Sequence, residues 1–158
     1  MTKENLSRLQ ALEREHQIRM YPSVPEHGLA KSKFSDNSAN NLTKSIVSFL
    51  NFSGHFAERI NTMGVYRAAK KVKDVDGITR TVGKGTYTKS TSTNGSSDIS
   101  ATISGRSVKI EVKMKTDRQS QAQKDYEKRT IQAGGFYFIA KDFDSFIEWY
   151  DELLNKIS

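Results

Sequence analysis

Apolar and polar residues alternate in two short runs near the middle of the chain. The apolar positions are Ile99, Ala101 and Ile103 in the first run, and Val108, Ile110, Val112 and Met114 in the second. A period of two is typical of strands with one buried face. Gly105-Arg106 lies between the runs, and glycine at the first central position favours a two-residue type II′ turn. The pattern therefore predicts an antiparallel hairpin.

This turn also predicts which residues of the hairpin face each other. The expected pairs are Ile103 with Val108, Ala101 with Ile110, Ile99 with Val112, Thr102 with Lys109, Ser100 with Glu111, and Asp98 with Lys113. Apolar residues then share one face and polar residues the other, whereas a slip by one residue would mix them. In this register Asp98 and Glu111 are diagonal neighbours, with Cα atoms about 7–8 Å apart.

The remaining pattern predicts four helices and two further strands. Apolar residues recur at helical spacing, weakly over residues 5–20 and more clearly over 41–52 and 144–157. A fourth helix is expected between its N-cap Ser120 and Gly134-Gly135. Residues 57–62 and 136–140 read as strands, and residues 64–95 as an irregular hairpin or long loop.

These elements predict an α/β fold in which a central mixed sheet is flanked by helices. From residue 41 onward their order is αβββαβα, with the irregular stretch inside it. We interpret residues 1–40 as an N-terminal arm, helical and then irregular, that either packs on a partner subunit or is a partly mobile tail. Residues 41–158 form the expected domain.

Composition narrows the classes of protein. The chain has 158 residues, of which 35% are hydrophobic and none is cysteine. Such a length can bury one core without disulfides, and the lack of cysteine excludes thiol catalysis and Cys-ligated zinc. No apolar run approaches the roughly 20 residues of a membrane span. We expect a cytoplasmic protein without membrane contact, in the host cytoplasm if a phage encodes it.

The charge of the chain is unevenly distributed. The chain has 25 Lys and Arg against 18 Asp and Glu. Residues 67–89 form a basic stretch whose only acidic residues are Asp74 and Asp76. We expect the following cations to bind the phosphate backbone of a nucleic acid: Arg67, Lys70, Lys71, Lys73, Arg80, Lys84, Lys89, Lys115 and Arg118. The alternative is a solvated loop. Tyr66 and Tyr87 lie in the same stretch and could meet a base or sugar.

The polar face of the predicted hairpin carries the candidate chemistry. Asp98 and Glu111 can converge there, and Mg²⁺ commonly uses one or two carboxylates together with water and phosphate oxygens. Lys113 lies two residues beyond Glu111 on the same face. This set suits phosphodiester hydrolysis, with Lys113 orienting the nucleophile or stabilising the charge that develops in the transition state.

Four short strings in this order resemble the PD-(D/E)XK nuclease superfamily, and specifically its VRR-NUC branch, which is common in phage-type genes. They are Gly95-Ser96-Ser97-Asp98-Ile99, Ile110-Glu111-Val112-Lys113, Gln123-Lys124-Asp125-Tyr126 and Ala133-Gly134-Gly135-Phe136. The resemblance covers residues 41–154. It implies a restriction-endonuclease-like fold in which Asp98, Glu111 and the Val112 carbonyl hold Mg²⁺ or Mn²⁺, Lys113 is the catalytic lysine, and Gln123 is the supporting helix residue. Gln123 also completes a capping box with Ser120, which is the alternative role.

The resemblance implies a divalent-metal-dependent endodeoxyribonuclease. Relatives act on structured DNA, such as flaps and four-way (Holliday) junctions, and several are homodimers. The chain departs from the family at the start of the first core helix, where Asn40-Asn41-Leu42-Thr43 stands in place of an acidic residue. Glu58 is a candidate for the missing carboxylate. The competing hypothesis is a DNA-binding module with a nuclease-like fold that does not cut.

Overall fold

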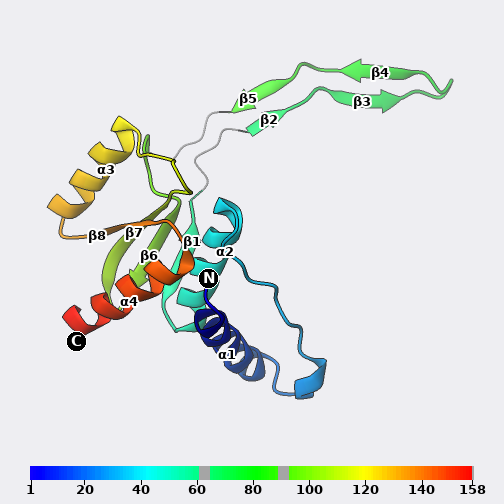
Figure 1. The fold of residues 1–158 in the computed structure, drawn as a ribbon. Coiled ribbons are helices and arrows are strands. Elements are labelled where there is room, and N and C mark those ends of the chain that lie inside the picture. The colour runs from blue at the N-terminus through cyan, green and yellow to red at the C-terminus, as the bar shows by residue number, and fades with distance from the viewer. Residues whose placement is uncertain (61–64, 89–92, 158) are drawn as a thin grey trace. The chain divides into compact units, whose positions relative to one another are not determined.

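The protein is described by a computed structural model over residues 1–60, 65–88 and 93–157 (Figure 1). The chain divides into two compact units. Unit 1 comprises residues 1–60 and 94–158, and unit 2 comprises residues 61–93. Unit 2 is thus an insertion in the sequence of unit 1.

Unit 1 contains a four-stranded mixed sheet and four helices. In chain order the elements are α1 (Lys3–Met20), a short 3₁₀ turn at Glu26–Gly28, α2 (Ala39–Phe52), β1 (Phe56–Arg59), β6 (Ile99–Ile103), β7 (Arg106–Val112), α3 (Gln121–Gln132), β8 (Phe136–Ala140) and α4 (Phe143–Ile157). The strand order is β1-β6-β7-β8, and only β8 runs parallel to its neighbour. The α/β class is confirmed, and the order from α2 to α4 is the expected αβββαβα.

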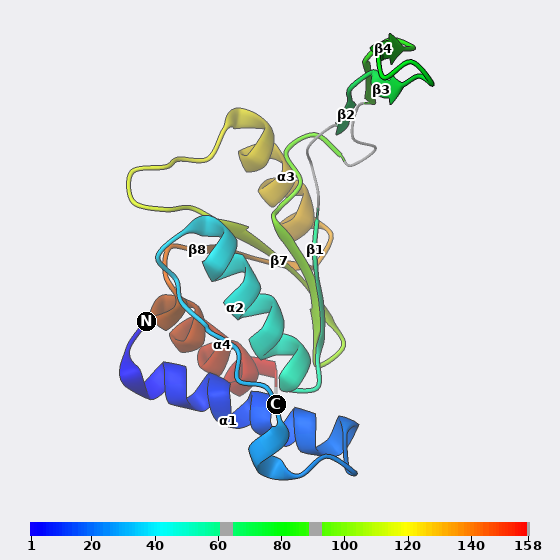
Figure 2. The ribbon, with the colours of Figure 1, turned by 90° about the vertical axis from the view of Figure 1, so that its right-hand side faces the viewer.

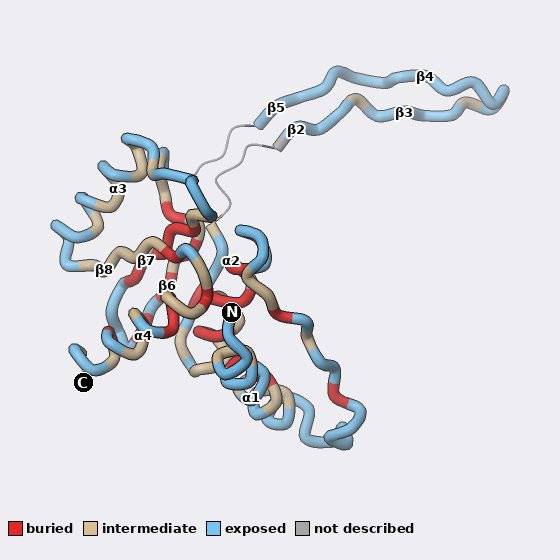
Figure 3. The backbone as a smooth tube through the Cα atoms, viewed as in Figure 1, coloured by how far each residue is buried: buried red, intermediate tan, exposed pale blue. Residues whose placement is uncertain are grey.

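Helices cover both faces of this sheet. The apolar face of β6 and β7, including Ile99, Val108 and Ile110, belongs to a buried core shared with α1, α2 and α4. The opposite face meets α3, because the ring of Tyr126 on α3 contacts the ring of Tyr137 on β8. Figure 2 shows α1, α2 and α4 grouped together, apart from α3. The buried positions of the backbone concentrate on β6, β7 and the helices that pack on them (Figure 3).

Residues 1–40 differ from the arm that the sequence suggested. Leu9 on α1 is fully buried in the core, and Leu6 and Leu12 pack against it. Arg8 forms an ion pair with Asp151 of α4 at 2.7 Å. The first forty residues therefore belong to unit 1 and pack on their own chain. The apolar spacing over 5–20 was weak because only a narrow stripe of α1 faces the core.

The β6–β7 hairpin forms in a different register from the predicted one. Its turn is Ser104-Gly105, with φ angles of 46° and 77°, so the predicted turn at Gly105-Arg106 is wrong. Two successive positive φ values are typical of a type I′ turn. The observed pairs are Ile99 with Ile110, Ser100 with Lys109, Ala101 with Val108, Thr102 with Ser107, and Ile103 with Arg106. A shift by two residues keeps apolar beside apolar, so alternation alone could not distinguish the two registers.

Most other boundaries agree with the expectations. The strand predicted at 136–140 is β8, and the helices predicted at 41–52 and 144–157 begin slightly earlier. Of the strand predicted at 57–62, β1 ends at Arg59, and Asn61 and Thr62 lie outside the described residues. In the described part of the chain, no helix has both the length and the apolar character to cross a bilayer.

Unit 2 consists of two short antiparallel ladders. Strand β2 (Val65–Arg67) pairs with β5 (Thr86–Thr88), and β3 (Lys70–Lys73) pairs with β4 (Thr79–Val82). Asp74 organises the turn between β3 and β4, because its Oδ1 accepts hydrogen bonds from the N–H groups of Asp76 and Ile78. The predicted irregular hairpin is therefore an interrupted two-stranded ribbon.

Candidate functional site

Glu111 is the buried charged residue of the central sheet. It lies on β7, is 1% exposed, and points away from the apolar core toward α3. Its Oε1 accepts a hydrogen bond from Gln123 Nε2 and lies 3.1 Å from Lys113 Nζ. Its Oε2 is buried and has no hydrogen-bond partner among the described residues. A buried carboxylate oxygen without a partner is costly in an interior that otherwise satisfies its polar groups.

Asp98 is fixed beside the same strand. Its Oδ2 accepts a hydrogen bond from the Val112 N–H at 2.9 Å, and its carbonyl accepts one from the Ile60 N–H at 2.8 Å. Extending the observed register by one residue brings Asp98 directly opposite Glu111. The expected diagonal arrangement, with Asp98 facing Lys113, is therefore wrong, and the two acids lie in the same row of the sheet.

The electrostatics of the site follow from burial and charge proximity. Burial, reinforced by the Asp98 carboxylate, raises the pKa of Glu111 to about 7, although Lys113 opposes the shift. Burial alone would lower the pKa of Lys113, but its interactions with Glu111 and Asp117 raise it overall. Lys113 Nζ lies 3.4 Å from Asp117 Oδ2. Lys113 is thus an ammonium between two carboxylates, and the site favours bound cations or protons.

Gln123 forms the predicted capping box and also contacts Glu111. Its Oε1 accepts a hydrogen bond from the Ser120 N–H at 2.9 Å, and the Ser120 hydroxyl accepts one from the Gln123 N–H at 3.3 Å. This reciprocal pair is the predicted capping box at the start of α3. The other end of the same amide, Nε2, donates to Glu111. One side chain therefore anchors α3 and holds the buried carboxylate.

Gly95 allows the segment before β6 to approach α3. Its φ is +78°, and a Cβ there would overlap the Ala122 carbonyl oxygen and lie 2.8 Å from the Gln123 nitrogen. Only glycine fits this close approach of two backbones. The segment that carries Asp98 and the first turn of α3 that carries Gln123 are held together at this point.

The structure brings together four of the predicted site residues, Asp98, Glu111, Lys113 and Gln123. Val112 contributes its N–H to Asp98, and the use of its carbonyl as a metal ligand stays a prediction. Lys115 and Arg118 are exposed in the loop between β7 and α3. Glu58 is exposed. It pairs with Ser100, which pairs with Lys109, so Glu58 does not lie in the same row of the sheet as Glu111. The six cations Arg67, Lys70, Lys71, Lys73, Arg80 and Lys84 lie in unit 2, and Lys89 falls outside the described residues.

Two residues of the site were not predicted. Asp117 reaches Lys113 from the irregular loop after β7, where no periodic pattern marks it. Tyr137 lies on the Glu111 face of β8, and burial together with the Glu111 charge raises the pKa of its hydroxyl. The run Phe-Tyr-Phe-Ile-Ala gives no alternation that would reveal this face. The available signal was the hydroxyl of Tyr137, which is the polar group in an otherwise apolar strand.

The donor set fits a hard divalent cation with few protein ligands. Within residues 1–60, 65–88 and 93–157, no group of three or more His, Cys, Asp or Glu could hold a metal ion. Mg²⁺, however, often takes only one or two carboxylates. Asp98 and Glu111 could supply two carboxylate ligands, and no residue that the structure describes donates a hydrogen bond to the buried Glu111 Oε2. These observations match the needs of Mg²⁺ or Mn²⁺.

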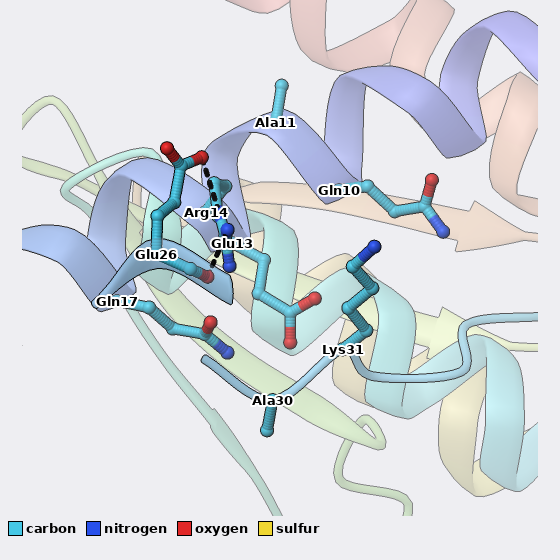
Figure 4. Close-up of a pocket in the computed structure, with 8 residues that line it drawn as sticks. All are labelled: Gln10, Ala11, Glu13, Arg14, Gln17, Glu26, Ala30 and Lys31. Carbon is cyan, nitrogen blue, oxygen red and sulfur yellow. Dashed lines mark hydrogen bonds and ion pairs between the residues drawn. The ribbon is translucent and has the colours of Figure 1, made fainter. Parts of the chain in front are cut away.

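A separate cavity of about 480 Å³ lies between α1 and the segment around residues 26–31 (Figure 4). Arg14 Nε donates to Glu26 Oε1 at 3.0 Å within it, and Glu13 Oε2 accepts a hydrogen bond from the Ser32 N–H at 3.3 Å. None of the carboxylate-site residues lines this cavity. The polar groups that line it come from the first 31 residues.

Comparison of the chain with protein-family models and with curated proteins gives no match.

Proposed function

We propose that this protein is a divalent-metal-dependent endodeoxyribonuclease of the PD-(D/E)XK type. The observation that carries the proposal is the buried Glu111 carboxylate: Lys113 and Gln123 share one of its oxygens, and the other has no hydrogen-bond partner among the described residues. A buried carboxylate with a raised pKa costs stability when it is ionised, and such residues cluster at functional sites. Acidic and cationic groups placed together in this way suit the hydrolysis of a phosphodiester.

Each residue has a defined part in the proposed reaction. Asp98 and Glu111 would hold the cation, and Gln123 would keep the Glu111 carboxylate in position through its hydrogen bond. Lys113, whose ammonium is retained because its pKa is raised, would orient the attacking water and stabilise the negative charge of the transition state. When bound, Mg²⁺ or Mn²⁺ supplies Lewis acidity toward the phosphoryl group and acidifies water.

The αβββαβα order and the mixed sheet support the nuclease fold within this proposal. The two acids and Lys113 lie on one face of the central hairpin, which is where the PD-(D/E)XK resemblance assigns them. The opposite face of the hairpin packs in the core. The register correction strengthens the site, because acids in one row can share an ion more readily than diagonal ones.

DNA is the proposed substrate because the chain carries a net charge of +7 and a basic stretch in unit 2. Among DNA structures, four-way junctions and flaps are proposed first, by analogy with the resembled family. Paired cuts across a symmetric junction require two active sites, so a homodimer is part of the proposal.

The proposal is tested by incubating the full chain with labelled linear, flapped and four-way DNA in Mg²⁺, in Mn²⁺ and in EDTA. We expect cleavage in either metal, none in EDTA, and faster cleavage of the branched forms. Binding of the same DNAs is measured in parallel by electrophoretic mobility shift. If the DNA stays intact in both metals but its mobility is clearly shifted, the nuclease proposal is overturned. The competing hypothesis of a non-cutting DNA-binding module then stands.

A further inference from the structure

The β3–β4 ladder of unit 2 has two chemically different faces. Cross-strand pairs join Lys71 with Thr81 and Lys73 with Thr79, and these four residues share one face. The alternate pairs join Lys70 with Val82 and Val72 with Arg80 on the other face. All eight residues are exposed in unit 2. We call the first group, Lys71, Lys73, Thr79 and Thr81, the Lys/Thr face.

The face opposite the Lys/Thr face can be explained by the stability of the ribbon. Each cation there stands across from a valine, in positions where aliphatic stems of Lys and Arg can cover apolar surface. Arg80 also pairs with Asp74 at 2.9 Å, which ties this face to the turn. An isolated two-stranded ribbon is marginal in water and needs such contacts.

The Lys/Thr face has no comparable structural explanation. Its four side chains carry ammonium and hydroxyl groups, and it has neither an apolar side chain nor a carboxylate. Protein interfaces are depleted of lysine and need aromatic or apolar anchors. Phosphate oxygens and the acceptor atoms of base edges, in contrast, are bound by Lys and Thr donors. The chemistry of this face therefore fits a nucleic acid better than a protein.

The width of the ribbon favours the major groove of undeformed B-DNA. Two paired strands lie about 4.8 Å apart before their side chains are added. The minor groove of B-DNA is only about 6 Å wide, whereas the major groove is about 12 Å wide and admits a two-stranded ribbon. We propose that the β3–β4 ribbon binds the major groove of duplex DNA with its Lys/Thr face. That the polyanion is DNA rests on the proposed function.

Neighbouring lysines provide a matched test. Lys70 and Lys71 are adjacent on β3 and exposed, and their side chains alternate between the two faces. Lys70→Ala and Lys71→Ala therefore remove the same charge from opposite faces. Fluorescence anisotropy of a short labelled duplex in EDTA measures binding without cleavage. The proposal assigns the phosphate contacts of this ribbon to the Lys/Thr face, and so takes Lys70 out of the set of cations that the sequence predicted to bind phosphate. We expect Lys71→Ala to weaken binding about 10-fold and to lower the salt slope by about 0.9, and Lys70→Ala to weaken it less than about 2-fold.

A charge-neutral pair of substitutions separates groove contact from general attraction. Thr79→Val with Thr81→Val keeps the charge and favours the strand, but removes both hydroxyl donors from the Lys/Thr face. We expect weaker duplex binding with an unchanged salt slope. We also expect methyl green, which occupies the major groove, to compete with the wild type, and netropsin, which occupies the minor groove, not to compete.

Equal losses for the two lysine variants, a larger loss for Lys70→Ala, or competition by netropsin alone would overturn the inference. The proposed nuclease can fail separately. If Lys71→Ala weakens binding more than Lys70→Ala but no DNA is cut, the proposed nuclease is rejected and the proposed groove binding stands. If DNA is cut but the two variants bind equally, the groove binding is rejected and the nuclease stands. A wild type that does not bind duplex DNA would also reject the ribbon.

Discussion

Glu111 concentrates the electrostatic cost of the site in one residue. A carboxylate on a buried sheet face loses hydration, and Asp98 in the same row adds repulsion. Lys113 and Gln123 compensate through one oxygen only. No described residue donates to the other oxygen, so under the proposed function it would be available to a proton or a cation.

The raised pKa of Glu111 predicts that Glu111→Gln stabilises the folded protein at alkaline pH. In the native state the proton is held up to a pKa of about 7, compared with an ordinary value of 4.5. The native state therefore binds more protons between these values, so wild-type stability falls as pH rises through this window. We expect the variant to be roughly 1–3 kcal/mol more stable near pH 8 and similar to wild type near pH 4. Urea unfolding in metal-free buffer measures the difference.

The control for this prediction is Glu148→Gln, which makes the same chemical change at an exposed position on α4. Its unfolding free energy should follow that of the wild type at each pH. If Glu111→Gln instead loses stability at alkaline pH, Glu111 is held by compensating contacts and is a structural ion-pair residue.

Single residues were predictable from sequence where two independent signals met at one position. Gln123 was marked by the spacing from Ser120 and by its place after Glu111 and Lys113, and it makes both contacts. Asp117 and Tyr137 had no such signal, because tertiary packing alone brings them to Glu111. The burial of Glu111 could not be predicted either, because a charged residue between two lysines is expected to be solvated.

At the scale of elements, the hairpin turn decides how the acids meet. Alternation predicted both strands and their faces, but registers that differ by two residues have the same alternation. The choice depended on whether Gly105 occupies the first or the second central position of the turn. Ser104 adopts a positive φ and moves glycine to the second position, which places Asp98 opposite Glu111.

Gly95 is predicted to be necessary for the packing of the Asp98 segment on α3. Gly95→Ala introduces a Cβ that overlaps the Ala122 carbonyl in addition to the strain of a positive φ. We expect a loss of roughly 2–4 kcal/mol in unfolding free energy by urea denaturation.

Gly105→Ala is the matched control, because its φ of +77° is similar and nothing lies within 4 Å of the new Cβ. It should cost only about 1 kcal/mol, the conformational part. Equal losses for the two variants would mean that the close approach at Gly95 contributes nothing.

At the scale of the whole molecule, unit 1 carries the two acids on the sheet face that points away from its apolar core, and unit 2 carries the basic ribbon. The αβββαβα order was predictable because its helices and strands have clear periods. The packing of α1 on its own chain was not predictable. A polar helix with a narrow apolar stripe has the same sequence pattern whether it packs on its own chain or on a partner. The division at residues 61–93 was visible in the sequence only as a basic stretch with irregular patterning.

The metal-ligand role of Glu111 is tested by the initial rate at which wild type, Glu111→Gln and Glu148→Gln cleave supercoiled plasmid in Mg²⁺ at equal concentration. We expect wild type and Glu148→Gln to cut at similar rates. We expect Glu111→Gln, folded and at least as stable, to cut at least about 100-fold more slowly. Cleavage by Glu111→Gln at the wild-type rate, or by none of the three proteins, would contradict this role.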